Sequence, residues 1–283
     1  WLEFRRVLFR SYISAITLAN ATDSSGGLAS NYLLPTLNAA NAPVTIGRKS
    51  LNLSATKTYD GTGILTGNVT INGLITGQTL TYIGATANTA NAGSTFISAI
   101  TITDGTGGGL ASNYQVPTLT SAYTYNNVTI TPKVVSLLAS KVYDGSTSLS
   151  GAVTISGLIG SQTLSYSNAA ASDINVATAG KYISTIVLAD GTGVNLGLAS
   201  NYQLPTLNLA NAPVTITAKA LTVTSVTANN KVYDATTLAT FSNAAALVGV
   251  VGSDNVLLTQ AGTFASKNVG TSIAVTANDS ISG

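Results

Sequence analysis

Short runs of alternating apolar and hydroxylated residues recur along most of the chain. They are rich in Val, Ile and Thr, and their two-residue period is typical of strands that bury one face. The runs cover residues 68–72, 79–83, 96–103, 152–156, 181–188 and 221–226. Asp-Gly and Asn-Gly pairs lie between them and supply the positive backbone φ angles of tight turns. No segment of helical length has a 3.6-residue period, so the pattern predicts an all-β fold of antiparallel strands.

Two alanine-rich stretches depart from this pattern. Residues 167–171 and 243–251 favour a short helical turn, because Ala has the highest helix propensity. Two interpretations of the repeat fold therefore stay open. An immunoglobulin-like sandwich is favoured, and the alternative is a β-grasp-like sheet whose single short helix falls at these stretches.

Three motifs recur in the same order and divide the chain into repeats of about 85 residues, a spacing typical of tandem domains. Lys-x-Tyr-Asp occurs at residues 57–60, 141–144 and 231–234. Leu-Ala-Ser-Asn-Tyr occurs at residues 28–32, 110–114 and 198–202. Val-Thr-Ile followed by Lys occurs at residues 44–49, 128–133 and 214–219. The structural signature of the repeat is Lys57, Tyr59, Asp60, Lys141, Tyr143, Asp144, Lys231, Tyr233, Asp234, Asn31, Tyr32, Asn113, Tyr114, Asn201 and Tyr202.

The motif order predicts two complete β repeats, at residues 50–133 and 134–219. Residues 12–49 hold only the later motifs and are expected to be the C-terminal part of a truncated repeat. Residues 220–283 are expected to be the N-terminal part of another, which makes the chain a fragment of a longer protein. A unit of this length can bury its own core without disulfides. The junctions contain no Gly/Ser linker, which favours an elongated, semi-rigid array.

The first eleven residues differ abruptly from the rest, with three of the four Arg residues and the only Glu and Trp. Residues 2–11, LEFRRVLFRS, resemble residue for residue the translated end of a short-read sequencing adapter. We interpret residues 1–11 as an adapter-derived artefact and leave them out of the fold. A basic targeting segment is the alternative, but the stretch has no apolar core and no small-residue cleavage site.

Composition excludes several classes of chemistry. The 283 residues contain no Cys, His or Met, so a Ser-His-Asp triad, a thiol nucleophile, a zinc-finger ligand set and disulfides are ruled out. The formal net charge of +2 falls to zero without residues 1–11, leaving nine basic residues and nine aspartates. A neutral chain gives no reason to expect a nucleic-acid partner. No apolar stretch reaches the length of a membrane-spanning helix. We predict no enzyme, no cofactor and no metal.

The repeated Tyr and Asp residues invite functional hypotheses that the spacing does not favour. Tyr59, Tyr143 and Tyr233 are expected to fill the core near a turn rather than stack on a ligand. Asp60, Asp144 and Asp234 are expected to hold their own turns, because each lacks a second acid or base at fixed spacing. The Asp-Gly-Thr-Gly loops at residues 104–107 and 190–193 favour turns over calcium sites, which usually need several carboxylates.

A sharper hypothesis concerns covalent cross-linking. Isopeptide bonds between Lys57, Lys141 or Lys231 and Asn31, Asn113 or Asn201 are an alternative role for the signature residues. No buried catalytic acid can be assigned to them from the sequence.

The starts at residues 141–147 and 231–237, together with the sequence of residues 251–283, carry a family resemblance. They are similar to the YDG-type repeat domains of large bacterial surface exoproteins, including filamentous-haemagglutinin-like adhesins. Two departures are Thr58 in place of Val and Ala235 in place of Gly. The resemblance implies an extracellular, secreted or outer-membrane-associated protein.

The resemblance also implies the function. We expect a monomeric array that serves as the stalk or passenger segment of an adhesin and projects a binding region from the cell. The alternative is that the repeats themselves bind glycans or proteins of a host, of its matrix or of neighbouring cells. A weaker alternative is a non-catalytic spacer of an extracellular enzyme. We expect no nucleic-acid partner and no membrane insertion by this segment.

Overall fold

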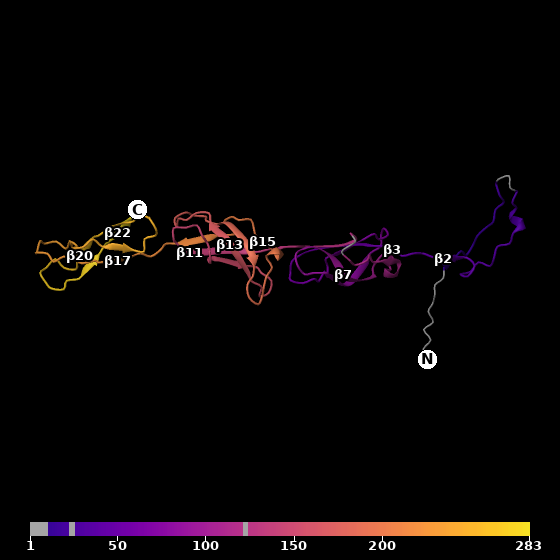
Figure 1. Ribbon diagram of the computed structural model, residues 1–283, viewed down its shortest axis with the longest axis horizontal. Helices are drawn as coiled ribbons and strands as arrows, with labels where there is room; N and C mark the ends of the chain where they lie inside the picture. Colours follow the sequence, from indigo (N-terminus) through magenta and orange to yellow (C-terminus); the bar gives the residue numbers. More distant parts are fainter. Residues whose placement is uncertain (1–10, 23–25, 121–123) are drawn as a thin grey trace, which may run out of the picture. The chain divides into compact units, whose positions relative to one another are not determined.

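The computed structural model describes residues 11–22, 26–120 and 124–283 (Figure 1). The segment interpreted as adapter-derived therefore lies outside the described residues, except for Ser11. The chain divides into two compact units, Trp1–Thr131 and Pro132–Gly283, and each is described by itself. The described regular structure consists of strands and three short 3₁₀ turns, which confirms the all-β prediction.

The first unit centres on a five-stranded sheet. Its spatial order is β5 (Val69–Asn72), β4 (Asn52–Thr58), β9 (Asn126–Thr131), β7 (Gly93–Asp104) and β6 (Leu80–Ala87). The first and last of these strands along the chain, β4 and β9, are parallel neighbours, and the other pairs are antiparallel. The shorter pairs of this unit are β1 (Ser11–Tyr12) with β2 (Pro43–Val44) and β3 (Lys49–Ser50) with β8 (Tyr114–Gln115).

Residues 133–217 of the second unit repeat this element order. β12 (Val153–Ser156), β11 (Ser136–Val142) and β16 (Val214–Thr217) form one sheet, in which β11 and β16 are parallel. β13 (Leu164–Ala171) and β14 (Ile183–Asp190) form an antiparallel hairpin, and β10 (Lys133–Val134) pairs in parallel with β15 (Tyr202–Gln203).

The prediction of wholly antiparallel strands is therefore wrong for the pairs β4–β9, β11–β16, β3–β8 and β10–β15, which are parallel. A long crossover separates β4 from β9 and β11 from β16, as parallel pairing requires. The immunoglobulin-like arrangement is not confirmed and stays a prediction.

Residues 220–283 form three two-stranded pairs. These are β17 (Thr222–Thr224) with β18 (Ala246–Val248), β19 (Leu257–Thr259) with β22 (Ser280–Ser282), and β20 (Gly262–Phe264) with β21 (Val275–Ala277). All three pairs are antiparallel.

The core of each repeat lies on the inward face of its first strand. Along β4, Leu53 and Ala55 are buried while Ser54 between them is exposed, as the two-residue period predicts. Leu65 and Ile97 complete this interior with no exposed surface. The corresponding buried residues of the second unit are Leu137, Ala139, Leu149 and Ile183.

The two alanine-rich stretches are not helical turns, so that prediction is wrong. Residues 167–171 belong to β13, and residues 246–248 form β18. Ala169 and Ala171 of β13 point into the core, and Asn168 between the pairing registers has a φ of 53° at a bulge. Pairing with β14 satisfies the backbone, and this tertiary constraint outweighs the helix propensity of Ala.

Each Leu-Ala-Ser-Asn-Tyr motif forms a single 3₁₀ turn through its Ala-Ser-Asn residues. The turns are η1 (Ala29–Asn31), η2 (Ala111–Asn113) and η3 (Ala199–Asn201). In η2 and η3 the following Tyr starts a short strand. Among the described residues, no helix is long and apolar enough to cross a membrane.

Truncation of Leu53 tests the core. Leu53→Ala should destabilise the first unit by about 2–4 kcal/mol, because it removes buried methyl groups and leaves a cavity. Hydrogen exchange of the β9 amides should then accelerate by about 30-fold or more. Ser54→Ala, on the exposed face of the same strand, is the control and should change exchange little. Equal effects of the two substitutions would contradict this core assignment.

Candidate functional site

The Lys-x-Tyr-Asp motif builds a loop around a buried ammonium group. Lys57 follows Leu53 and Ala55 on the inward face of β4, so its side chain is only 5% exposed. Its Nζ donates to Asp60 Oδ1 at 2.6 Å, to the carbonyl oxygens of Thr62 and Ile64 at 3.0 and 2.9 Å, and to Thr62 Oγ1 at 3.3 Å. We call this arrangement the lysine clamp.

The carboxylate of Asp60 closes the loop from the other side. Its Oδ1 also accepts hydrogen bonds from the backbone N–H and the hydroxyl of Thr62, both at 2.9 Å. Gly61 between these residues has a φ of 79°, which Gly adopts without strain. The predicted turn-holding role of Asp60 fits this geometry, and the buried Lys is the group that the turn encloses.

The other two motifs form the same clamp. Lys141 Nζ bonds to Asp144 Oδ1 at 2.5 Å and to the carbonyl oxygens of Ser146 and Ser148. Lys231 Nζ lies 2.8 Å from Asp234 Oδ1 and donates to the carbonyl oxygens of Thr236 and Leu238. Two of the acceptors in each clamp are main-chain oxygens, so the side chains at those positions are free to differ.

The clamp stabilises the ionised carboxylate in all three copies. Burial opposes ionisation of Asp60, but hydrogen bonds from Lys57 and Thr62 outweigh it and lower the pKa of Asp60. The hydrogen bond from Lys141 lowers the pKa of Asp144. The hydrogen bond from Lys231, helped by the Thr236 N–H, lowers the pKa of Asp234 from 3.8 to about 2.

The three motif tyrosines occupy different environments. Tyr59 is 4% exposed, as a core position requires, whereas Tyr233 is 57% exposed, so the prediction of a core role is wrong for Tyr233. The half-buried Tyr143 donates its hydroxyl hydrogen bond to Asp254 Oδ2 at 2.9 Å within the second unit. This bond raises the pKa of the Tyr143 phenol, because its ionisation would place two negative charges together.

The Asn-Tyr motif ties a 3₁₀ turn to a distant loop. Tyr114 Oη accepts from the backbone N–H of Ile75 at 3.2 Å and donates to Gln78 Oε1 at 2.5 Å. Tyr202 Oη makes the same two bonds, to Ile159 N–H at 3.0 Å and to Gln162 Oε1 at 2.5 Å. Tyr32 of the first motif is instead mostly exposed.

Sequence reasoning missed both glutamines and one buried lysine. The signal for the glutamines was a repeated Gln-Thr-Leu at residues 78–80 and 162–164. Lys181 is buried and donates to the carbonyl oxygens of Val176 and Thr178, so it holds a second loop in the manner of the clamp. Residues 50–133 have no counterpart of this lysine, because Thr95 stands at its place before the buried Ile97.

The Asp-Gly-Thr-Gly loops act as turns. Asp104 Oδ1 accepts from the backbone N–H of Ala111 at 2.7 Å, and Asp190 Oδ1 accepts from that of Ala199 at the same distance. In the first partial repeat, Asn20 makes the equivalent bond to Ala29. A neutral amide replaces the carboxylate there, so the bond depends on a side-chain oxygen and needs no charge. Within the described ranges, no three acidic residues cluster as a metal ion would require.

The structure favours no cross-link between the signature lysines and asparagines. Among the described residues, every hydrogen bond of the three clamp ammonium groups goes to the clamp's own loop. The backbone N–H groups of Asn113 and Asn201 bond to Leu110 and Leu198 within their 3₁₀ turns. These contacts give the two motifs separate structural roles.

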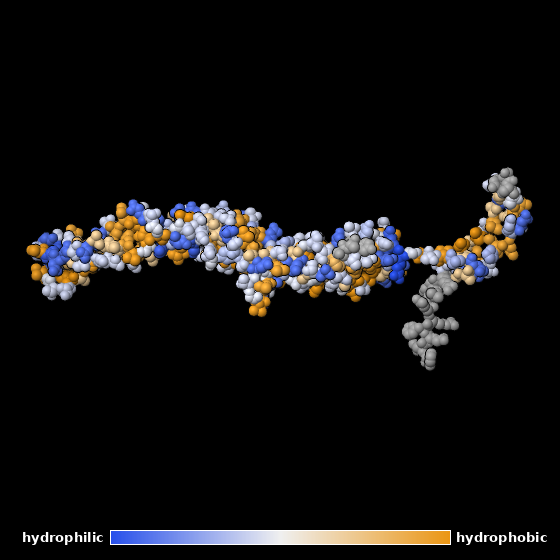
Figure 2. Space-filling view, viewed as in Figure 1, coloured by the Kyte–Doolittle hydropathy of each residue, from blue (hydrophilic) through white to orange (hydrophobic). Residues whose placement is uncertain are grey.

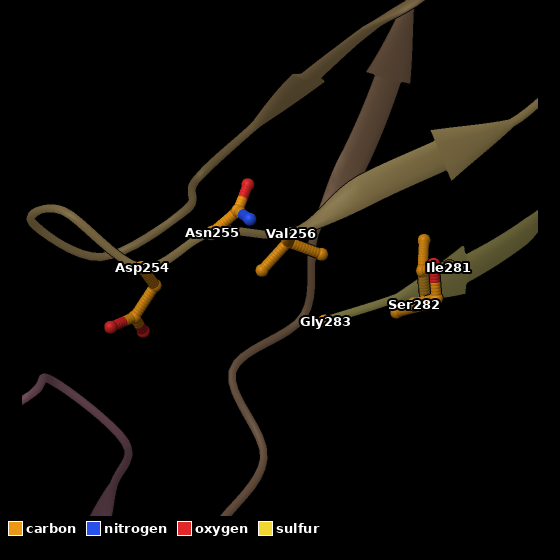
Figure 3. Close-up of a pocket in the computed structure, with 6 residues that line it drawn as sticks. All are labelled: Asp254, Asn255, Val256, Ile281, Ser282 and Gly283. Carbon is orange, nitrogen blue, oxygen red and sulfur yellow. The ribbon is translucent and has the colours of Figure 1, made fainter.

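The grooves of residues 220–283 offer little chemistry. Figure 3 shows one beside the β19–β22 pair, with a volume of about 440 Å³, lined by residues 254–256 and 281–283. Among its lining side chains Asp254 is the ionisable one, and its carboxylate already accepts the bond from Tyr143. A lone acid with a structural partner is poor machinery for acid–base catalysis.

Removal of one clamp ammonium tests its structural role. Lys57→Met keeps the aliphatic bulk but leaves the Thr62 and Ile64 carbonyls without their donor, which should cost about 2–4 kcal/mol. Hydrogen exchange of residues 60–65 reports this loss locally. Lys49→Met, at an exposed lysine of the same unit, is the control and should stay within about 0.5 kcal/mol of the parent. Indistinguishable exchange in the two variants would rule the clamp out as a stabilising element.

The clamp also predicts acid sensitivity. The folded-state pKa values of the clamp aspartates are lowered, so their stabilising contribution is complete above the unfolded value near 3.8 and is lost as pH falls. For Asp234 the loss should occur between about pH 4 and pH 2. Carboxyl chemical shifts measured by NMR should give a midpoint near 2 for Asp234. In Lys231→Met the midpoint should move up, and an unchanged midpoint would show that the Lys231 hydrogen bond is not what lowers it.

Comparison with protein families gives a match at the end of the sequence. Residues 217–283 match the model of the YDG domain, which confirms the resemblance for that stretch. No curated protein and no solved structure matches the chain significantly. The matched stretch contains the third lysine clamp, at Lys231 and Asp234, and the two preceding repeats reproduce its geometry. The chain therefore contains a YDG domain at residues 217–283.

Proposed function

We propose that this chain is a force-transmitting stalk segment of a large secreted or surface-attached bacterial adhesin, which projects a binding region from the cell. The proposal concerns residues 12–283, since we interpret residues 1–11 as adapter-derived. The observation that carries it is the parallel pairing of the first and last long strands of a repeat. In the first unit this pairing runs through six residue pairs, from Leu53 opposite Asn126 to Thr58 opposite Thr131.

Parallel pairing sets how a pulling force acts on the repeat. The chain enters β4 at one end of the pair and leaves β9 at the opposite end. Tension along the chain therefore slides the two strands past each other and loads their hydrogen bonds together. In an antiparallel pair with both chain ends on one side, the bonds would open one after another. A fold loaded in shear is suited to a stalk that transmits force.

Contacts within the second unit support a semi-rigid connection between consecutive repeats. Besides the Tyr143–Asp254 bond, Gly145 lies against Val251, where an added Cβ would meet Val251 Cγ1 at 2.8 Å. Gly145 also has a φ of 76°. The Tyr-Asp-Gly element thus contacts a loop of the next repeat. Such a semi-rigid connection is what a spacer needs if it is to keep a binding region at a distance.

Single-molecule pulling along two axes tests the proposal. The chain has no Cys, so introduced thiols attach handles uniquely. Handles at Asn52→Cys and Thr131→Cys load the β4–β9 pair in shear, and handles at Thr58→Cys and Thr131→Cys unzip it. We expect a clearly higher unfolding force for shear. Pulled end to end, a complete repeat of 84 residues should release about 250–300 Å of chain.

Equal forces along the two axes would refute the force-transmitting role. A glycan array or matrix-protein binding assay on the same chain addresses the alternative function. Specific binding together with equal forces would favour repeats that are themselves the adhesive surface.

A further inference from the structure

The pair Asn72-Gly73 ends β5 and begins the turn that follows it. Gly73 has a φ of 90°, which explains why a Gly stands there. The Asn has no such geometric reason. The equivalent residue of the second unit is Ser156, and it is followed by Gly157 with a φ of 81°. The turn therefore requires the Gly but not the Asn.

Asn followed by Gly carries a chemistry of its own. Asn is a thermolabile residue, because the main-chain nitrogen of the next residue can attack its side-chain Cγ. Ammonia leaves, and a cyclic succinimide remains. Water then opens one of the two ring carbonyls and gives Asp or isoaspartate. A following Gly favours the attack, since it has no side chain to shield the nitrogen.

The chain also has four Asp-Gly pairs, which form the same ring by loss of water. In two of them the lysine clamp stabilises the ionised carboxylate, at Asp60 and at Asp144. An ionised carboxylate resists attack by nitrogen, because it offers no neutral leaving group. The clamps therefore protect these two pairs.

The other two Asp-Gly pairs are protected at the attacking nitrogen. Gly105 N–H donates to the carbonyl oxygen of Gly109 at 2.9 Å. Gly191 N–H makes the same bond, to the carbonyl oxygen of Gly197 at 2.9 Å. Neither nitrogen reaches the Cγ of the preceding Asp without breaking the hydrogen bond that closes its loop.

Asn72-Gly73 has neither kind of protection. Both residues are exposed, and within the described residues neither the Asn72 side-chain amide nor the Gly73 N–H makes a hydrogen bond. Asn72 is the last residue of β5, so its amide and the Gly73 nitrogen can turn toward each other while the other pairs of β5 with β4 stay in place. Gly73 lies beside Ser50 of β3, and Figure 2 shows strongly hydrophilic surface around that strand.

We propose that Asn72 is a site of spontaneous modification, at which the folded chain deamidates to Asp and isoaspartate through a succinimide with Gly73. The bond between Asn72 Cγ and its amide nitrogen breaks, and a bond between Cγ and the Gly73 nitrogen forms. The amide nitrogen leaves as ammonia and takes the proton of the Gly73 N–H. One water molecule then opens the ring, so the reaction needs no enzyme and no reactant besides water.

Isoaspartate changes the main chain as well as the charge. It routes the chain through the side-chain carbons of residue 72, which adds one carbon to the main chain ahead of Gly73. The space on one side is already occupied, because a Cβ added to Gly73 would meet Ser50 O at 3.1 Å. The lengthened chain therefore has to move away from β3.

The residues that follow carry this change to the core. Leu74 packs against a buried cluster that includes Tyr114, and Ile75 N–H donates to Tyr114 Oη at 3.2 Å. A longer main chain displaces both residues from Tyr114, whereas Asp, which adds only a charge at an exposed position, leaves them in place. The second unit has Ser156 at the equivalent position, so ageing acts on one of the two complete repeats.

Peptide mapping of the whole chain, aged at body temperature and mildly alkaline pH, tests the reaction. Asn72 should convert progressively to a mixture of Asp and isoaspartate, which chromatography and electron-transfer fragmentation distinguish. Asn52 is an internal control, because it lies opposite Asn72 in the same sheet but is followed by Leu53. Asn52 should stay unmodified, and so should residue 72 in Asn72→Ser. An unmodified Asn72, or equal conversion of Asn52, overturns the proposal.

A destabilised variant shows whether the folded chain reacts. Leu53→Ala raises the unfolded population of the first unit. The rate of conversion at Asn72 should nevertheless equal that of the parent, because the amide and the Gly73 nitrogen are already accessible in the folded turn. A rate that rises with the unfolded population would show that the folded turn protects Asn72, and the proposal would be wrong.

Hydrogen exchange at Ile75 N–H measures the consequence. In the isoaspartate form, separated by ion exchange, this amide should exchange about 10-fold faster than in the fresh chain, as expected for the loss of one hydrogen bond. Freshly prepared Asn72→Asp carries the charge without the added carbon, so it is the matched control and should keep the protection of the parent. Unchanged protection in the isoaspartate form would contradict the loosening of this loop.

Discussion

Parallel pairing between the first and last long strands is the constraint on which each complete repeat depends. It brings residues more than 70 positions apart, such as Ala55 and Val128, into direct register at the centre of the sheet. The inward faces of both strands supply the core, and the hairpin β6–β7 or β13–β14 is added beside it. Because such pairing is non-local, neither strand can bury its apolar face until most of the repeat has been traversed.

The lysine clamp supplies hydrogen-bond donors to main-chain carbonyls at one end of this sheet. The loop after the first strand turns away with main-chain carbonyls pointing inward, and buried carbonyls need donors. One ammonium group supplies three protons at a single point, and an aspartate in the same loop balances its charge. In a chain with so few charged residues, a Lys–Asp pair holds this loop in all three copies, and in the two complete repeats the lysine lies on the inward face of the first strand.

The sequence predicted part of this architecture well. The two-residue period located strands such as β5 and β12 but missed β4, and the Asp-Gly pair at residues 60–61 located the turn. The parallel pairing could not be inferred, because alternation identifies a strand but not the direction of its neighbour. The same limit applies to Ala169 and Ala171, whose propensity favoured a helix until pairing with β14 decided otherwise. Tyr59 and Tyr233 share a motif but differ in burial, because burial depends on what covers the motif. Gln78 was missed because its partner, the Tyr114 hydroxyl, lies on a distant turn.

Burial of the clamp ammonium groups also affects proteolysis. Proteases of trypsin-like specificity must draw a Lys or Arg side chain into a deep pocket. Between its junction lysines, residues 50–133 offer one such residue, Lys57, and residues 134–219 offer two, Lys141 and Lys181. All three side chains are held inside the fold by main-chain carbonyls. Between its junction lysines a folded repeat therefore presents almost no cleavable basic residue, and the interaction that shapes each loop also protects that stretch from digestion.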